Sequence, residues 1–349
     1  MDDLDLDIYR WMYPGGVFSM YGVDPRITTS DIAPHVGLTR TAVWARIRQW
    51  ERDGFWKGLR VHPNPTIFGE KIYRVEIPVA DTVEGGNLID ELEVVDGILG
   101  ANISFGDTSN DKMVHVVVLR FTAAGAIEVD RRMRVLRRLS PTGTAHGPWI
   151  DEVPDVTRTL TALDRRIIGL LVKNPNASLT QVARLLGVTL KTLVRRRSAL
   201  LDAHALFYRP NVDWTKHPSV TLLFFCWEVA DVDRVKAAVT LRFPHFLHFP
   251  RVGVGYMGEA YTANDWFAGL VPAHSPREVP VLVLELSRLP GVKTVRPEVS
   301  GPSRSFHRWA NQRGAELLAA AQEIPPRRVG HAGLSTTKGR GRAPVPPSS

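Results

Sequence analysis

The sequence predicts an α+β fold in which small helical domains alternate with small sheet domains, each kind occurring twice. Three observations lead to this prediction. Residues 28–50 align with residues 178–200 at a constant offset of 150. After each of these segments, runs rich in β-branched and aromatic residues alternate with stretches of helical period. With 349 residues, the chain is also longer than a single hydrophobic core usually supports.

Both copies of the repeated segment have the spacing of a helix-turn-helix. Two helices that cross steeply need a small residue where they approach, and the tight turn between them needs a residue that tolerates positive φ. The second helix then needs an apolar residue that packs on the first. The residues at these three positions are Ala33, Gly37 and Val43 in the first copy and Ala183, Gly187 and Leu193 in the second.

Start signals for both helices accompany this spacing. Thr28 with Asp31, and Ser178 with Gln181, have the pattern of a capping box, in which a hydroxyl residue and an acceptor side chain three positions later satisfy free backbone donors. Thr39 and Thr189 are suitable N-caps for the second helix. Two such patterns in register favour a helix-turn-helix over an ordinary helical hairpin.

The segments that follow have the element order β-α-β-β-α-β, which is the ferredoxin-like arrangement. In the first unit we expect strands at 72–79, 101–105, 113–121 and 146–153, with helices near 84–95 and 124–139. In the second unit we expect strands at 220–229, 247–254, 260–271 and 292–299, with helices near 231–242 and 276–289.

The predicted chain is therefore two winged helix-turn-helix domains that alternate with two ferredoxin-like βαββαβ domains. The expected winged helix-turn-helix domains are 1–66 and 160–214, and the sheet domains are 70–156 and 218–302. A helix at 303–325 follows, and then a basic tail at 326–349 whose low apolar content predicts disorder. The first copy also carries an insertion between Pro14 and Arg26.

The second helix of each helix-turn-helix has one apolar face and one polar face. On a helical wheel, Val43, Ile47 and Trp50 share the inner face of the first copy, and Leu193 and Leu200 that of the second. Long cations on the opposite face are suited to reach phosphates or base edges in a major groove. The candidate DNA-binding residues are Arg40, Thr41, Trp44, Arg48, Arg52, Lys191, Arg195 and Ser198.

Arg197 departs from this pattern, because it stands where the first copy has the apolar Ile47. Two explanations stay open: the side chain extends along the apolar surface to reach water, or the second copy is a less selective DNA-reading unit. A second basic run, Arg131 to Arg138, is more simply a helix packed on the sheet with a solvated basic face, although it could also touch phosphates.

Composition limits the class of protein. The formal net charge of +8 makes a polyanion such as double-stranded DNA the first partner to test. The single cysteine, Cys226, excludes an intrachain disulfide and a multi-cysteine metal site. The acidic N-terminus is unlike a signal peptide, and no apolar run approaches the length of a spanning helix. We therefore expect a cytoplasmic protein with no membrane partner.

These residues resemble the leucine-responsive/asparagine (Lrp/AsnC) family of transcription regulators, up to about residue 300. The family pattern of Ala, Gly-Leu-Thr, Val and Arg-Ile is matched here by Ala33, Gly37-Leu38-Thr39, Val43 and Arg46-Ile47. The second copy reads Ala183, Gly187-Val188-Thr189, Leu193 and Arg196-Arg197. The resemblance implies sequence-specific DNA binding, sheet domains that pair with each other, and dimerisation of the chain.

The resemblance also implies a small-molecule effector bound at the sheet domains. The family's effector-loop glycine and acid correspond here to Gly106-Asp107 and Gly258-Glu259. The residues after both pairs depart from the family pattern. We expect no metal site, since His245 and His248 form a close pair without a third ligand. We also expect no cofactor and no catalytic residues, so that the protein would not be an enzyme.

Two alternatives stay open. Siroheme decarboxylases have the same doubled scaffold, and the run Asn264-Asp265-Trp266-Phe267 after His248 is similar to a motif beside their tetrapyrrole. The first unit has no such motif. The other alternative is an architectural protein that coats DNA without sequence preference and without an effector, for which a salt-dependent and sequence-independent affinity is diagnostic.

Overall fold

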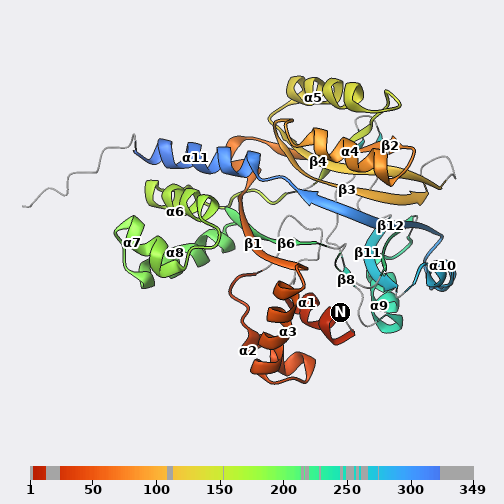
Figure 1. Ribbon diagram of the computed structural model, residues 1–349, viewed down its shortest axis with the longest axis horizontal. Coiled ribbons are helices and arrows are strands. Elements are labelled where there is room, and N and C mark those ends of the chain that lie inside the picture. Colours follow the sequence, from red (N-terminus) through yellow and green to blue (C-terminus); the bar gives the residue numbers. More distant parts are fainter. Residues whose placement is uncertain are drawn as a thin grey trace, which may run out of the picture.

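The computed structural model describes residues 3–12, 24–107, 113–151, 153–213, 216, 220–227, 229–243, 247–248, 255–256, 259–260, 266–273 and 275–322. The protein is a mixed α+β chain with antiparallel sheets, as the sequence predicts (Figure 1). A ten-stranded sheet forms its centre, and two helical domains lie beside it. Within the described residues, no helix has both the length and the apolar character needed to cross a bilayer.

The first half of the large sheet has the strand order β5-β2-β4-β3, which is the ferredoxin-like order. Its strands are β2 (Lys71–Val79), β3 (Ile98–Asp107), β4 (Met113–Ala123) and β5 (His146–Asp151). Helices α4 (Thr82–Leu92) and α5 (Ala126–Leu139) connect them and cover one face (Figure 1). The core between these layers is closed by apolar side chains such as Ile77, Leu92, Leu119 and Phe121.

The second half has the order β12-β7-β11-β8, which is the same arrangement. Its elements are β7 (Val220–Trp227), α9 (Val232–Arg242), β8 (Leu247–His248), β11 (Trp266–Ala273), a 3₁₀ turn at Pro276–Glu278, α10 (Val279–Ser287) and β12 (Thr294–Ser305). Strands β9 (Gly255–Tyr256) and β10 (Glu259–Ala260) extend to the opposite edge of the large sheet, next to β5.

The two halves are joined edge to edge by β3 and β12. The first part of β12 pairs with β7, and its second part, from Glu298 to Ser305, pairs with β3. Glu298 and Val299 pair with both neighbours, and the register with β3 shifts between Ser300 and Ser303. Because β12 continues to Ser305 rather than ending near residue 299, it closes an edge that each four-stranded sheet would otherwise expose.

The first helical domain contains α1 (Asp3–Met12), α2 (Thr29–Ile32), a 3₁₀ turn (Ala33–Val36) and α3 (Arg40–Arg52). The second contains α6 (Ala162–Lys173), α7 (Leu179–Leu186) and α8 (Leu190–Asp202). The C-terminal helix α11 (Arg308–Gln322) lies along α6 (Figure 1). Gly169 of α6 and Gly314 of α11 face each other there, because a Cβ at Gly169 would lie 2.6 Å from the Gly314 carbonyl oxygen.

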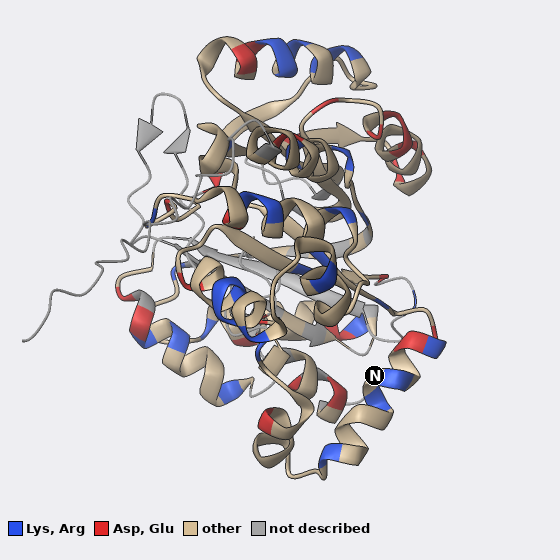
Figure 2. Cartoon of the chain, turned by 90° about the vertical axis from the view of Figure 1, so that its left-hand side faces the viewer, with Lys and Arg blue, Asp and Glu red and all other residues tan. Residues whose placement is uncertain are grey.

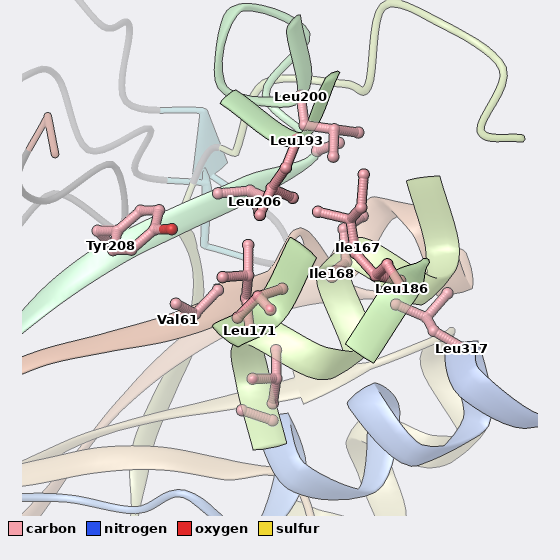
Figure 3. Close-up of a cluster of buried hydrophobic side chains, with 14 of the residues drawn as sticks. Val61, Ile167, Ile168, Leu171, Leu186, Leu193, Leu200, Leu206, Tyr208 and Leu317 are labelled. Atoms are coloured by element: carbon pink, nitrogen blue, oxygen red, sulfur yellow. The ribbon is translucent and has the colours of Figure 1, made fainter. Parts of the chain in front are cut away.

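The strands after the two helix-turn-helix segments pair with each other. β1 (Trp56–Pro63) and β6 (Leu206–Val212) form a separate antiparallel ribbon, in which Arg60 lies opposite Arg209 and Val61 opposite Tyr208. After β1, a 3₁₀ turn at Pro65–Phe68 leads to β2. Val61 therefore joins the core of the second helical domain, together with Leu193, Leu206 and Leu317 (Figure 3).

Candidate nucleic-acid interface

The turns between the helices have the geometry that the glycine spacing predicts. Gly37 and Gly187 both adopt the left-handed conformation, with φ of 65° and 67°. Ala33 and Ala183 are buried where the helices cross. The first copy differs in one respect: Pro34 has no backbone N–H to donate, and the helix tightens from α to 3₁₀ at Ala33.

The capping predictions are also confirmed. The backbone N–H of Thr28 donates to the Asp31 carboxylate at 2.7 Å, and the N–H of Ser178 donates to Gln181 at 2.8 Å. The Thr39 and Thr189 hydroxyls accept from the backbone N–H groups of Ala42 and Thr192. These bonds fix where α3 and α8 begin, and so fix which residues project from their first turns.

In each helical domain, an ion pair between an acid and an arginine connects the first helix (α1 or α6) to the helix with the exposed basic face (α3 or α8). These ion pairs were not predicted from the sequence. Arg46 donates to Asp5 at 2.8 Å, and Arg196 donates to Asp164 at 3.1 Å. Asp164 is fully buried and also accepts from Arg158 at 2.6 Å. Burial tends to raise the pKa of Asp164, but hydrogen bonds from Thr161 and Arg196 and the charge of Arg158 lower it below its ordinary value. The sequence does contain a signal for these ion pairs: the dipeptide Leu-Asp occurs at 4–5 and at 163–164, and the two arginines lie one repeat of 150 residues apart.

The inner face of each second helix is packed as the wheel predicts. Val43 and Trp50 are buried and Ile47 is half-buried in the first domain, while Leu193 and Leu200 are buried in the second. In the first domain, Trp50 contacts Tyr9 and Phe55 edge-on, with ring centroids 6.4 and 6.0 Å apart. The outward residues are thus not needed for packing.

The outer face of α3 presents a group of exposed residues: Arg40, Thr41, Trp44, Arg48 and Arg52. Trp44 is 52% exposed, and the Arg48 guanidinium lies 5.1 Å from the centroid of its ring. Arg48 also pairs with Glu51 at 2.5 Å, and Arg52 donates to Gln49. Among the described residues, no carboxylate pairs with Arg40. An exposed aromatic ring among three arginines is suited to a polyanionic, partly apolar groove.

The outer face of α8 is less basic. Lys191 and Arg195 are exposed without an ion-pair partner in the described part of the chain, whereas Ser198 is only half-buried rather than fully outward. At the positions that correspond to Arg40 and Trp44, this helix has Leu190 and Val194, which are 45% and 39% exposed. The position of Arg52 is taken by Asp202, which pairs with Arg26 at 2.6 Å.

Arg197 lies at the junction of the two helical domains. It is half-buried, and its charge acts both on Asp24 of the first domain and on the buried Tyr208. Burial raises the pKa of the Tyr208 hydroxyl, and the charge of Arg197 opposes this rise. An arginine at this position of α8 therefore supplies positive charge near Asp24 of the first helical domain.

The described candidate effector residues lie on opposite sides of β2 and β4. Gly106 and Asp107 end β3, where they pair with Val114 and Met113. Glu259 pairs with Tyr256 in the β9–β10 hairpin, next to β5 and on the far side of β2 and β4. Gly258 lies outside the described residues. The structure therefore does not bring Glu259 next to Gly106 and Asp107 within one chain.

The basic run on α5 is a sheet-packed helix. Val129, Met133 and Leu136 are buried beneath it, and most of its arginines are exposed. Figure 2 shows this helix, with its basic positions in blue, at the top of the molecule. Arg132 is the exception: it is buried, and its guanidinium lies where a Cβ of Gly97 would be. His245 lies outside the described residues, and those that are described hold no cluster of three metal-ligating side chains.

Comparison with known families agrees with the geometry at the N-terminal end. Residues 21–55 match the family described as winged helix-turn-helix DNA-binding. The chain carries a winged helix-turn-helix. The matched segment includes α2, the turn at Gly37 and α3, with the whole outer face of α3. This winged helix-turn-helix confirms a DNA-binding domain, whereas the duplication along the chain stays a prediction.

Solved structures similar to the chain fall into two groups. A siroheme decarboxylase, NirDL, is 14% identical with a TM-score of 0.47, and the similarity covers 92% of this chain and 100% of that chain. AsnC from E. coli is 16% identical with a TM-score of 0.28, covering 41% of this chain and 93% of that chain. LrpA from Mycobacterium tuberculosis is 20% identical with a TM-score of 0.25, covering 40% and 86%. No curated protein sequence matches the chain.

One prediction is contradicted by these similarities. We predicted that the chain is not an enzyme, but two solved structures that are similar over nearly its whole length are those of a siroheme decarboxylase. The resemblance to AsnC and Lrp regulators rests on shorter segments, about two fifths of the chain. The prediction was wrong because the exposed cations of α3 and α8 bear on DNA binding by the helical domains and not on the chemistry of the rest of the chain.

Proposed function

We propose that the chain is a transcription regulator that binds double-stranded DNA with sequence preference, and that α3 is its main reading helix. The observation that carries this proposal is the outer face of α3, where exposed arginines lie around Trp44 while Val43 and Trp50 bury the opposite face. Arginine is the side chain best suited to guanine edges in the major groove, and its charge serves phosphates equally well.

The second domain would hold the duplex rather than select its sequence. Its helix α8 has two exposed cations, Lys191 and Arg195, that pair with no carboxylate in the described part of the chain. It has apolar or acidic residues at the three positions where α3 has Arg40, Trp44 and Arg52. Phosphate contacts of this kind add affinity for every sequence alike. A homodimer, which the family resemblance implies, would place two reading helices α3 on one site.

The test is a titration of labelled duplexes at several salt concentrations, after selection from random DNA. The quadruple variant Arg48→Ala, Arg52→Ala, Lys191→Ala, Arg195→Ala should lose both its preference and much of its affinity. Arg137→Ala with Arg138→Ala on α5 is the matched control, because these cations are exposed outside the interface. Equal binding by the quadruple variant and the wild type would refute the proposal.

A second candidate is decarboxylation of a tetrapyrrole. The observation that favours it is the register of β8 and β11, which places His248 opposite Gly269, three residues after Trp266 in the strand that continues the Asn-x-Trp-Phe run. The purified protein should then bind iron-uroporphyrin III with a change in its visible spectrum. Absence of a spectral change, together with specific DNA binding, would leave the regulator as the remaining candidate.

A further inference from the structure

The ribbon of β1 and β6 is centred on equivalent positions of the internal repeat. The offset of 150 residues makes Leu59 equivalent to Arg209, and Arg60 equivalent to Pro210. In the antiparallel register, Leu59 lies opposite Pro210, and Arg60 lies opposite Arg209. Exchanging each residue for its equivalent reproduces the same two pairs, as a local two-fold axis through the centre of the ribbon does.

The two strands are also held reciprocally away from this centre. The carbonyl oxygen of Phe55 accepts from the backbone N–H of Asp213 at 2.8 Å, and that of its equivalent, Ala205, accepts from the N–H of Asn64 at 3.1 Å. Val61 of β1 belongs to the core of the second helical domain, whereas Val212 of β6 packs against the core of the first. The two helical domains therefore exchange strands within one chain.

Buried contacts fix the two helical domains to each other. Val61 and Tyr208 lie opposite each other in the ribbon and are only 4% and 6% exposed. Leu59 packs against the cores of both domains. Arg26 of the first domain also pairs with Asp202 of the second at 2.6 Å, although an exposed pair of this kind contributes little by itself. Because the strands that follow α3 and α8 share packed cores, the two helices belong to one rigid unit.

The ribbon relates α3 to α8, because the same number of residues joins each helix to its strand: 53–55 and 203–205. In homodimeric helix-turn-helix proteins, a two-fold axis relates two identical reading helices, and their DNA sites are palindromic for this reason. The two helices of this chain have different outer faces. Arg40 and Trp44 of α3 correspond to Leu190 and Val194 of α8, which are 45% and 39% exposed.

From this geometry we propose that one chain is a complete DNA-binding unit and that it recognises a non-palindromic duplex element. The inference rests on the proposed function. In this arrangement α3 contacts the preferred bases, and α8 contacts phosphates on one side of them only. The element is therefore specified at one end and covered without base preference at the other. A homodimer reads two copies of this element in inverted orientation.

The test starts from selection of the full chain against random duplex DNA. Footprinting and mass measurement then use the shortest duplex that retains full affinity. We expect one chain per duplex, a preferred sequence without internal two-fold symmetry, and protection that extends beyond this sequence on one side. Lys191→Ala with Arg195→Ala should shorten the protection on that side and leave the preferred bases unchanged. Arg137→Ala with Arg138→Ala, at exposed positions of α5, is the matched control and should change neither.

A second variant tests the asymmetry directly. Leu190→Arg, Val194→Trp and Ser198→Arg together give α8 the outward residues that α3 has at the equivalent positions. We expect this triple variant to select an inverted repeat of the bases that the wild type prefers, still with one chain per duplex. The matched control replaces the same three residues with alanine and should keep the one-sided preference.

Binding of the wild type only as two chains on a palindrome would overturn the inference and leave the proposed function intact. A triple variant that is folded by circular dichroism and keeps the one-sided preference would also overturn it. If the triple variant does not fold, the stoichiometry and the footprint of the wild type decide. A chain that binds no duplex, or every duplex alike, refutes the proposed function itself and the inference with it.

Discussion

Single side chains set the orientation of the reading helices. The Asp5–Arg46 pair connects α1 to α3, and the Asp164–Arg196 pair connects α6 to α8 at the equivalent place. Because Asp164 is fully buried while its two arginines are about a third exposed, the carboxylate depends on these partners for its charge. The outward residues of α3 are exposed and do not connect helices, so substituting them should weaken DNA binding without affecting folding.

Asp164→Asn should destabilise the second helical domain by about 2–3 kcal/mol at neutral pH, less than a fully buried pair because Arg158 and Arg196 keep contact with water. The folded-state pKa of Asp164 is lowered, so its stabilisation is present above the ordinary carboxyl pKa and is lost as the pH falls through the folded value. The difference between wild type and variant in denaturant melts should therefore shrink below about pH 4. Asp202→Asn, at an exposed pair, is the control and should cost below about 1 kcal/mol. A difference that is independent of pH would contradict this explanation.

Arg48→Ala should weaken binding to the preferred duplex by about 1–3 kcal/mol and relax the preference at one base pair. Lys191→Ala should instead weaken binding to all duplexes by a similar factor. It should also reduce the slope of log affinity against log salt concentration by about 0.9. Both variants should keep the wild-type melting temperature, since both side chains are exposed. Competition titrations with point-substituted duplexes measure the difference. A uniform loss in Arg48→Ala would show that this arginine contacts phosphate only.

At the scale of elements, the crossing of α11 and α6 attaches the C-terminal helix to the second helical domain. Gly169 and Gly314 allow the two backbones to approach, and Leu317 adds to the core that α6, α7 and α8 share (Figure 3). At the other end of α11, Trp309 donates to the buried Glu70 at 2.8 Å, which links the helix to the start of β2. Helix α11 therefore holds a helical domain and the sheet together.

Gly169→Ala should destabilise the protein by about 1–3 kcal/mol, because the new Cβ lies 2.6 Å from a backbone oxygen of α11 and the helices must separate. Gly86→Ala on α4 is the matched control: no atom lies within 4 Å of its Cβ, and alanine in a helix should stabilise by up to about 1 kcal/mol. Thermal melts compare the two variants, and limited proteolysis should show α11 cleaved faster in Gly169→Ala. Equal melting temperatures would indicate that the crossing adapts freely.

At the scale of the whole molecule, two pairings of distant strands make the halves interdependent. β1 pairs with β6, and β3 pairs with β12, so each half supplies a strand that covers an edge of the other. The ion pairs Arg26–Asp202 and Lys57–Asp213 also cross between the halves. An unpaired edge is a template for association with other chains.

Residues 1–156 and 157–349, expressed as separate chains, should therefore associate when produced together and aggregate or self-pair when produced alone. Copurification through a tag on one half and sedimentation of each half measure this. Arg304→Ala, which removes the pairs with Asp90 and Glu93 across the joint, should weaken the association of the halves, whereas Arg138→Ala should not. A stable, monomeric 1–156 fragment would show that the joint is dispensable.

The parts that the sequence predicted are local ones. The turn glycines, the caps and the apolar faces of α3 and α8 follow from φ preferences, short-range hydrogen bonds and helical period, which act within a few residues. The order of strands and helices along the chain followed from the same periodicities. The prediction that the chain is not an enzyme was wrong, because exposed cations on two helices say nothing about the chemistry of other surfaces.

The sequence by itself determined the α+β class, the first winged helix-turn-helix, its packed and exposed faces and the excess of positive charge. Only the tertiary structure decided that β1 pairs with β6 and that β12 joins the two sheets. The physical reason is that strand pairing uses backbone groups which every residue carries, so the partner of an edge strand leaves no local signature. Residues that such pairing brings together are separated by up to 205 positions, from Gly100 to Ser305, and no spacing pattern connects them.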